Sequence, residues 1–209
     1  MDLGATLFST SWASGVNAYA TIVLLNLLGR VGLGDVPEPL QGDVVLIVGL
    51  VMYSIEFVCD KVPFLDSVWD AVHTVIRPVI SGAIAAAYGS ADELPTSDEV
   101  LATGGAVAIA LASHAVKSVL RLGINTSPEP ASNIIASLLE DGMVGVVVFL
   151  AVENPVAAAA IAAILLAIGI CLAIILWKTI RRAYQALRRH YGREPPDEPD
   201  SPTGRTAGL

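Results

Sequence analysis

Polar and charged side chains recur at matched spacing inside two mostly apolar stretches of this 209-residue sequence. Within each stretch, spacings of four, four and three residues place the polar side chains along one stripe of a helix. Carboxylate, amide and hydroxyl oxygens on such a stripe can bind a hard cation, move a proton or hold a polar solute. The first stretch carries Asp66, Asp70, Thr74 and Arg77, and the second, offset by 63 residues, carries Glu129, Asn133, Ser137 and Glu140.

A pathway for a small ion or polar solute is the function that these stripes predict most directly. Their oxygen-bearing side chains outnumber the bases that could pair with them, and charged groups within a membrane face the bundle interior or a water-filled cavity. An earlier segment rich in small and polar residues adds Asn17, as a ligand if its helix is interrupted there, or as part of tight helix packing. The candidate pathway residues are Asp66, Asp70, Thr74, Asn133, Ser137, Asp141 and Asn17.

Charged residues at equivalent positions of the two copies have opposite signs. Such positions are expected to meet near a pseudo-two-fold axis, as in transporters built from parallel repeats. Paired charges can also simply hold helices together without a wet path, and the sequence leaves both interpretations open. The predicted pairs are Arg77 with Glu140, and Glu56 and Asp60 with Lys117 and Arg121.

Other kinds of chemistry have less support in the sequence. His114 is a candidate proton relay, with a hydrogen-bonded packing role as the alternative. The patterns H-E-x-x-H and G-x-S-x-G and the P-loop do not occur, and Asp66, Asp70 and Asp141 lack the remaining signature of membrane phosphoalcohol transferases. We therefore expect no enzyme, no cofactor and no nucleic-acid partner, and we assign no metal.

The elements that must position these residues are membrane-spanning helices. Hydrophobic residues make up 54% of the sequence and charged residues 15%, as in integral membrane proteins. A span needs roughly 20 mostly apolar residues. The predicted fold is all-α, a polytopic transmembrane helical bundle of about six helices with an internal two-helix repeat. The apolar windows are residues 4–29, 43–60, 69–91, 99–121, 132–152 and 155–177.

One transmembrane domain over residues 1–178 contains all of these windows, with repeat units at about 43–91 and 99–152. Residues 179–209 are expected to be a cytoplasmic tail, first basic, then acidic and disordered. Half of the 12 Lys and Arg residues closely follow the last window, which predicts a cytoplasmic location for this end. Counting back through six spans places the N-terminus in the cytoplasm too, with only Arg30 against this orientation.

Three groups of residues taken together resemble one family of bacterial membrane proteins. They are SWASGVNAYAT, then E-x-x-x-D-K-V-P-x-x-D-x-x-W-D-x-x-H-T-x-x-R-P, then S-H-x-x-K-x-x-x-R followed by N-x-S-P-E-P-x-S-N and S-x-x-E-D. These motifs resemble domain of unknown function family 4126 over most of residues 10–177. The resemblance implies an integral membrane fold and supplies no substrate or catalytic role.

The expectation is therefore a multi-pass protein of the bacterial inner membrane, with both termini cytoplasmic, that contacts membrane lipids and forms a homo-oligomer. Its expected function is that of a channel or transporter for a small ion or polar solute, with the polar stripes lining the pathway. The alternative is a non-transporting scaffold or lipid-binding protein in which the same charges are buried structural pairs.

Overall fold

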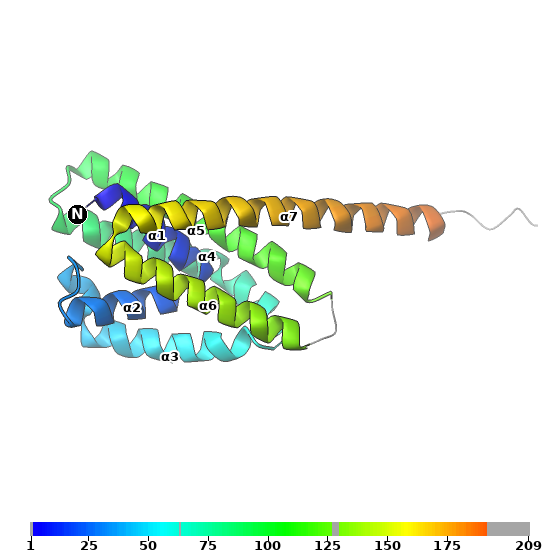
Figure 1. Cartoon of the computed structure of the whole chain (residues 1–209), viewed down its shortest axis with the longest axis horizontal. Helices are drawn as coiled ribbons and strands as arrows, with labels where there is room; N and C mark the ends of the chain where they lie inside the picture. Colours follow the sequence, from blue (N-terminus) through cyan, green and yellow to red (C-terminus); the bar gives the residue numbers. More distant parts are fainter. Residues whose placement is uncertain (1, 63, 127–129, 192–209) are drawn as a thin grey trace, which may run out of the picture. The chain divides into compact units, whose positions relative to one another are not determined.

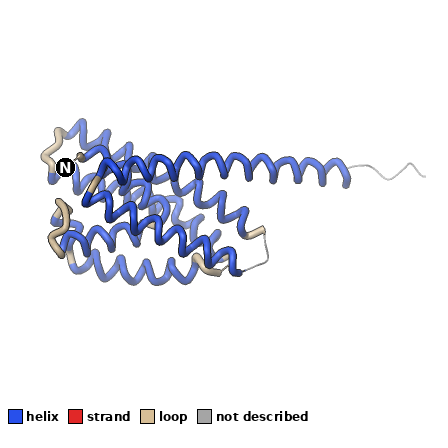
Figure 2. Tube along the Cα trace, in the orientation of Figure 1, coloured by secondary structure: helices blue, strands red, loops and turns tan. Residues whose placement is uncertain are grey.

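The computed structural model describes residues 2–62, 64–126 and 130–191, and every regular element within these ranges is helical. Figures 1 and 2 show long helices joined by short connections. The all-α fold predicted from the sequence is confirmed. In chain order the elements are α1 (Leu3–Val16), α2 (Ala18–Arg30), the 3₁₀ helix η1 (Glu38–Gln41), α3 (Asp43–Cys59), α4 (Leu65–Ala91), α5 (Thr96–Ile124), α6 (Pro130–Glu153) and α7 (Pro155–Tyr191).

Contacts between Cα atoms divide the chain into two units, Met1–Leu176 and Trp177–Leu209. The first unit holds α1 to α6 and the first part of α7. In the second unit, the structure describes the continuation of α7 as far as Tyr191. The basic stretch after residue 178 is therefore helical as far as Tyr191, and the predicted disordered end lies outside the described residues.

Four helical segments among the described residues are long and apolar enough to cross a membrane. They lie in α4, α5, α6 and α7, as expected of a multi-pass membrane protein. α3 has 17 residues and is also strongly apolar, with an exposed row of aliphatic side chains. The four segments are Leu65–Ala91, Thr96–Ile124, Ala131–Glu153 and Pro155–Ala186.

The first predicted span, residues 4–29, is not one helix, because the chain breaks at Asn17. The backbone there is extended, with φ −148° and ψ 100°. The Asn17 N–H donates to the Ala13 carbonyl at the end of α1, and its side-chain oxygen accepts from the N–H of Ala20 in the first turn of α2. One residue thus caps two helices. At 14 and 13 residues, each helix is about 20 Å long, too short to cross a bilayer core of about 30 Å.

α1 runs parallel to α5, as two side-chain hydrogen bonds show. The Ser113 hydroxyl donates to the Trp12 carbonyl at 3.0 Å, and the Lys117 ammonium donates to the Val16 carbonyl at 3.1 Å. Since the residue numbers rise together along both helices, α1 begins toward the end of the bundle at which α5 begins. Most of α1 is buried, against α4, α5 and α6.

α2 runs back toward the end from which α1 came. The side-chain amide of Asn26 donates to the carbonyls of Leu40 and Gly42, directly before α3, at 2.7 and 3.0 Å. α2 therefore ends where α3 begins, and α1 and α2 form a helical hairpin whose tip, residues 15–18, lies about halfway along α5 (Figure 1). We call the end where α3 and α5 begin the Asp43 end, and the opposite end the Lys61 end.

The hairpin changes the topology that six spans would give. α1 begins at the Asp43 end, whereas the side chain of Leu176 packs beside Gly123 near the last turn of α5, at the Lys61 end. Six spans would have placed both points at one end. The prediction that both termini lie on one side rested on that span count, and the interruption at Asn17 removes its basis. The residue ranges of the predicted repeat units, 43–91 and 99–152, span the hairpins α3–α4 and α5–α6, and the repeat itself stays a prediction.

Candidate functional site

A cluster of ionised side chains lies inside the first unit, around the tip of the α1–α2 hairpin. Charged residues are almost never fully buried unless they are paired, and removing an ion from water costs several kcal/mol. Within the cluster, Glu56, Asp66, Arg77 and Arg121 are 0% exposed. The buried charge cluster consists of Glu56, Asp60, Asp66, Asp70, Arg77, Lys117, Arg121 and Glu140, from α3, α4, α5 and α6 and the residue after α3.

Arg77 of α4 is the centre of one half of this cluster. Its Nη2 lies 2.6 Å from Glu56 Oε1 on α3 and 2.9 Å from Asp70 Oδ1, about two helical turns back along α4. Its Nη1 donates to His114 Nδ1 at 2.7 Å and lies 3.4 Å from the Gly15 carbonyl at the tip. A single guanidinium thus connects two carboxylates, a histidine and the interrupted helix.

Lys117 and Arg121 of α5 form the other half. Lys117 Nζ lies 2.8 Å from Asp60 Oδ2 and 3.4 Å from Glu140 Oε2. Arg121 holds Glu140 through both of its carboxylate oxygens, at 3.1 and 2.7 Å, and Arg121 Nη1 also donates to the Asp60 carbonyl at 2.9 Å. The sequence predicted that Glu56 and Asp60 pair with Lys117 and Arg121, and such pairs are present. Asp60 Oδ2 also lies 3.6 Å from Arg121 Nη2, and Glu56 Oε1 lies 3.8 Å from Lys117 Nζ.

The predicted contact between Arg77 and Glu140 is wrong. Among the described residues, Arg77 forms its ion pairs with Glu56 and Asp70, and Glu140 forms its ion pairs with Lys117 and Arg121. The physical reason is that Arg77 and Glu140 each find their ion-pair partners within their own helical hairpin. Glu56 faces Arg77 across α3–α4, and its sequence equivalent Lys117 faces Glu140 across α5–α6, so the same pair occurs twice with its signs exchanged.

The tip of the α1–α2 hairpin presents backbone and amide groups to these charges. The carbonyls of Gly15 and Val16, at the C-terminal end of α1, accept from Arg77 and Lys117. Helix C-termini carry partial negative charge, so cations stabilise them. Asn17 is 1% exposed, and its Nδ2 donates to Asp141 Oδ1 on α6 at 3.0 Å. The interruption that the sequence left open is therefore present, and Asn17 contacts a second candidate pathway residue, Asp141, there.

A chain of hydrogen bonds joins the remaining candidates toward the Lys61 end. Asn133 Nδ2 donates to Asn125 Oδ1, and Asn125 Nδ2 donates to Asp66 Oδ1, each at 2.8 Å. The Ser137 hydroxyl accepts from Lys61 Nζ at 3.2 Å. The sequence analysis missed Asn125, whose only signal was its place in the N-x-S-P-E-P-x-S-N motif, at the end of α5. Glu129, the first polar position of the stripe that continues with Asn133 and Ser137, lies outside the described residues.

His114 is buried and lies between Arg77 and Thr74. Its Nδ1 accepts from Arg77, so the proton of the neutral ring is on Nε2, which lies 3.1 Å from the Thr74 hydroxyl. That hydroxyl in turn donates to the Asp70 carbonyl at 3.1 Å. Both ring nitrogens are therefore engaged, and the proton-relay role stays a prediction.

Several buried oxygens in this region have no hydrogen-bond partner among the described residues, although such groups are normally satisfied. Asp70 Oδ1 is one of them by hydrogen-bond geometry, yet it lies 2.9 Å from Arg77 Nη2, so we treat it as ion-paired. Asp66 Oδ2 lies 3.9 Å from Arg121 Nη1. The oxygens left over are Glu56 Oε2, Asp60 Oδ1, Asp70 Oδ2, Asn133 Oδ1 and Asp141 Oδ2.

Residues 5–175 match the model of the family described as Domain of unknown function (DUF4126). The chain belongs to this family. The match covers the α1–α2 hairpin, the whole buried charge cluster and most of the first unit. No curated protein and no solved structure matches the chain.

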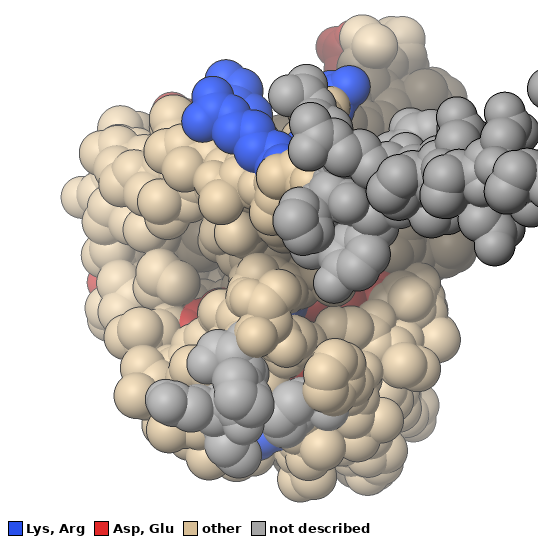
Figure 3. Space-filling view, turned by 90° about the vertical axis from the view of Figure 1, so that its right-hand side faces the viewer, with Lys and Arg blue, Asp and Glu red and all other residues tan. Residues whose placement is uncertain are grey.

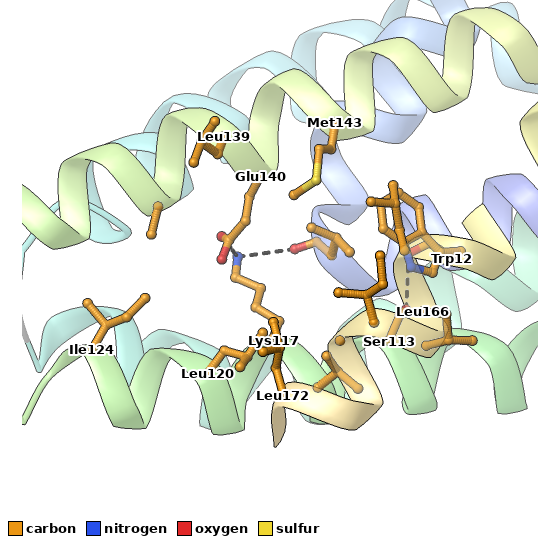
Figure 4. A pocket seen from close by; sticks show the side chains of 16 residues that line it. Trp12, Ser113, Lys117, Leu120, Ile124, Leu139, Glu140, Met143, Leu166 and Leu172 are labelled. Carbon is orange, nitrogen blue, oxygen red and sulfur yellow. Dashed lines mark hydrogen bonds and ion pairs between the residues drawn. The ribbon is translucent and has the colours of Figure 1, made fainter. Parts of the chain in front are cut away.

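The cluster is reached by a largely apolar pocket on one side. This pocket has a volume of about 300 Å³, and Lys117 and Glu140 stand together on its wall among Leu, Ile and Met side chains (Figure 4). Viewed onto the Lys61 end, acidic side chains are visible in recesses of a described surface that is mostly uncharged (Figure 3). Within the described ranges, no group of three or more His, Cys, Asp or Glu residues is arranged to hold a metal ion.

Asp60 lies just after α3, and its carboxyl is held ionised by its neighbours. Burial alone raises the pKa of this carboxyl. The Lys117 ammonium and the Arg121 guanidinium outweigh burial and hold the pKa below its usual value. Asp60 is therefore a fixed negative charge of the cluster at neutral pH.

Proposed function

We propose that this protein is an integral membrane channel or transporter for a small ion or polar solute. In this account the pathway passes the tip of the α1–α2 hairpin and the polar stripes of α4 and α6. Asp66, Asp70, Asn133 and Asp141 face the pathway, while Thr74, Ser137 and Asn17 add oxygen ligands. The remaining charges of the buried charge cluster hold the helices around it.

The observation that carries the proposal is the interrupted helix surrounded by surplus carboxylate oxygens. Discontinuous helices whose ends meet within a membrane supply backbone groups to solute and ion sites in known transporter folds. Here such a break, at Asn17, contacts Asp141 directly, and Asp141 Oδ2 has no hydrogen-bond partner among the described residues. Ionisable groups within a membrane mark functional sites far more often than chance.

The orientation proposed for the bundle follows from the charges at its two ends. Acidic residues gather toward the Asp43 end, where Arg30 is also neutralised by its ion pair with Asp43. Lys61 and the basic residues that follow Leu176 in the sequence favour the cytoplasm for the Lys61 end. The start of α1 would then face the opposite side. The acidic residues are Asp35, Glu38, Asp43, Asp92, Glu93, Asp98, Glu99 and Glu153.

The alternative is a non-transporting membrane scaffold or lipid-binding protein, and one observation favours it. Charges of the cluster already form short ion pairs with one another, with Arg77 at 2.6 Å from Glu56 and Arg121 at 2.7 Å from Glu140. In that account the ion pairs only hold the helices together, and lipid fills the apolar pocket beside Lys117 and Glu140. The two functions differ in whether solute crosses the membrane.

Flux through proteoliposomes tests the proposal. Purified protein is reconstituted with dyes for Na⁺, K⁺ and pH inside the vesicles, and with light scattering to detect uncharged solutes. We expect flux of at least one species above that of empty vesicles, and a loss of about tenfold or more in Asp141→Asn. Asp98→Asn, an exposed carboxylate at the Asp43 end, is the matched control and keeps full flux.

Two results would contradict the proposal. Wild-type vesicles that pass no tested species faster than empty vesicles would favour the scaffold. Equal flux in wild type and in Asp141→Asn would place the pathway elsewhere.

A further inference from the structure

A second, more polar pocket lies on the side of the bundle where α4 meets α5. It has a volume of about 240 Å³. Its lining differs from that of the apolar pocket, because four of the six lining residues carry a hydroxyl or a carboxylate and none carries a side-chain nitrogen. The lining residues are Ser67, Asp70, Ala71, Thr74, Ser118 and Leu122. We call it the α4–α5 pocket.

We infer that the α4–α5 pocket binds one small monovalent cation of the Na⁺ type through the carboxylate of Asp70 and the hydroxyls of Ser67, Thr74 and Ser118. This names the substrate or coupling ion of the proposed pathway and in that respect rests on the proposed function.

Asp70 supplies the charge at the floor of the pocket. The residue is 2% exposed, and its Oδ2 has no hydrogen-bond partner among the described residues. Its other oxygen lies 2.9 Å from Arg77 Nη2. One carboxylate oxygen is thus fixed by the guanidinium, and the second is buried without a hydrogen-bond partner in a residue that lines the pocket.

The charge balance around Asp70 favours a cation of charge one. Arg77 is shared between Asp70 and Glu56, so two carboxylates share one guanidinium. His114 contributes no charge, because its Nδ1 accepts from Arg77 and its single ring proton is on Nε2. Glu56 Oε1 also lies 3.8 Å from Lys117 Nζ, whereas Arg77 is the one ion-pair partner of Asp70 among the described residues. Asp70 is thus only partly neutralised, and a monovalent ion in the pocket supplies the missing positive charge.

The oxygen-bearing side chains of the pocket favour a bound metal cation over a proton on Asp70. Hard cations are bound by several oxygens at once, whereas protonation of Asp70 would need none of the surrounding hydroxyls. Ser67, Asp70 and Thr74 lie three and four residues apart and so share one face of α4. Pro78, within α4, has no N–H to donate to the Thr74 carbonyl, which leaves a further oxygen without its helical partner.

Binding at this pocket is connected to the hairpin tip. The Thr74 hydroxyl lies 3.1 Å from His114 Nε2, His114 Nδ1 accepts from Arg77, and Arg77 Nη1 reaches the Gly15 carbonyl. A cation that neutralises Asp70 weakens its hold on Arg77 and so acts on the group that contacts the tip. Cation binding at the pocket is therefore coupled to the position of the hairpin tip.

Thermal unfolding of the full-length protein in detergent tests the site without any need for transport. Melting is followed by tryptophan fluorescence at constant pH and ionic strength, with NaCl replaced stepwise by choline chloride. We expect saturating NaCl to raise the melting temperature by about 5 °C over choline chloride. Ser118→Ala, which removes one ligand and leaves the Arg77 pairs intact, should raise the NaCl concentration at half-effect about tenfold. Ser54→Ala, an exposed hydroxyl on α3, should behave as wild type.

Three results would overturn the inference. They are equal melting temperatures in NaCl and choline chloride, an unchanged NaCl response in both Ser118→Ala and Asp70→Asn, and stabilisation by lowered pH or by MgCl₂ in place of NaCl. The proposed function fails separately. A Na⁺-specific shift in a protein that passes no solute keeps the site and removes transport, whereas flux without any Na⁺ response does the reverse.

Discussion

Replacing Arg77 by Gln should destabilise the protein more than any other single substitution in the buried charge cluster. Arg77 is 0% exposed and holds two carboxylates, at 2.6 and 2.9 Å. Its removal leaves Glu56 without a guanidinium and Asp70 without any ion pair. Breaking a buried pair by removing one partner costs about 3–5 kcal/mol. For a chain of this size, that corresponds to a fall of roughly 10 °C in melting temperature.

A double-mutant cycle makes this prediction specific to the pairing that the structure shows. Glu56→Gln removes the partner at 2.6 Å, so the double variant Glu56→Gln/Arg77→Gln should recover about 1–3 kcal/mol relative to the sum of the single variants. Glu140→Gln lies in the other hairpin, and its effect should add to that of Arg77→Gln within about 0.5 kcal/mol.

Thermal or denaturant unfolding of the reconstituted variants measures all of these values. An Arg77→Gln melting temperature within about 2 °C of wild type would refute the argument that this guanidinium neutralises buried carboxylates. Coupling of Arg77 with Glu140 instead of with Glu56 would refute the account of charges neutralised within each hairpin.

Two further predictions concern the tip and the end of α3. Gly15→Ala should destabilise the protein by about 1–3 kcal/mol, because a Cβ at Gly15 would collide with the Ala110 backbone. Gly142→Ala is the control and should not destabilise it, because no atom lies within 4 Å of a Cβ placed there. Equal melting temperatures of the two variants would contradict the close approach of α1 to α5. The carboxyl pKa of Asp60 is held low, so its stabilisation is present above about pH 4 and is lost as the pH falls through its folded-state pKa. The gap in melting temperature between wild type and Asp60→Asn should therefore narrow as the pH is lowered from 6 to 3, and a constant gap would contradict it.

Much of the helical framework follows from the sequence, because long apolar windows bounded by Pro, Gly and acidic residues leave few alternatives. The windows at 43–60, 99–121 and 132–152 correspond closely to α3, α5 and α6. The spacing that matched Glu56 and Asp60 with Lys117 and Arg121 also led to real contacts, since Lys117 lies 2.8 Å from Asp60. Periodicity and charge sign were sufficient for these features.

The break at Asn17 was only one of two alternatives at the level of sequence. Residues 4–29 are apolar enough for one span, and a single Asn does not reveal whether the chain continues or turns back. The decision depends on tertiary contacts, because the end of α1 is held by Arg77 and Lys117, and α2 is held by the bonds from Asn26 to the residues before α3. Propensity carries no information about such distant partners.

The partner of Arg77 was predicted wrongly for a related reason. Opposite signs at equivalent positions are compatible with contacts between the hairpins and with contacts inside each hairpin. The structure has Glu56 with Arg77 in one hairpin and Lys117 with Glu140 in the other. The shortest ion pair between the hairpins is made by Asp60, which reaches both Lys117 and Arg121. Longer ones join Glu56 to Lys117 at 3.8 Å and Asp66 to Arg121 at 3.9 Å. Sequence spacing fixes the stripe on which a charge lies, but not which neighbouring helix that stripe faces.

The central claim is that the carboxylates and amides around the hairpin tip line a hydrated pathway. Water accessibility tests it most directly, with Asp70→Cys and Asn133→Cys introduced singly after Cys59 and Cys171 are replaced by Ser. Membrane-impermeant thiol reagents are added from each side of oriented vesicles, and Ser54→Cys on the exposed face of α3 serves as a control for labelling through lipid. We predict that both positions react, and that Asn133→Cys reacts from the side of the Lys61 end. Full protection of both positions from both sides, in protein that keeps a cooperative melting transition, would contradict the pathway and leave the charges as structural pairs.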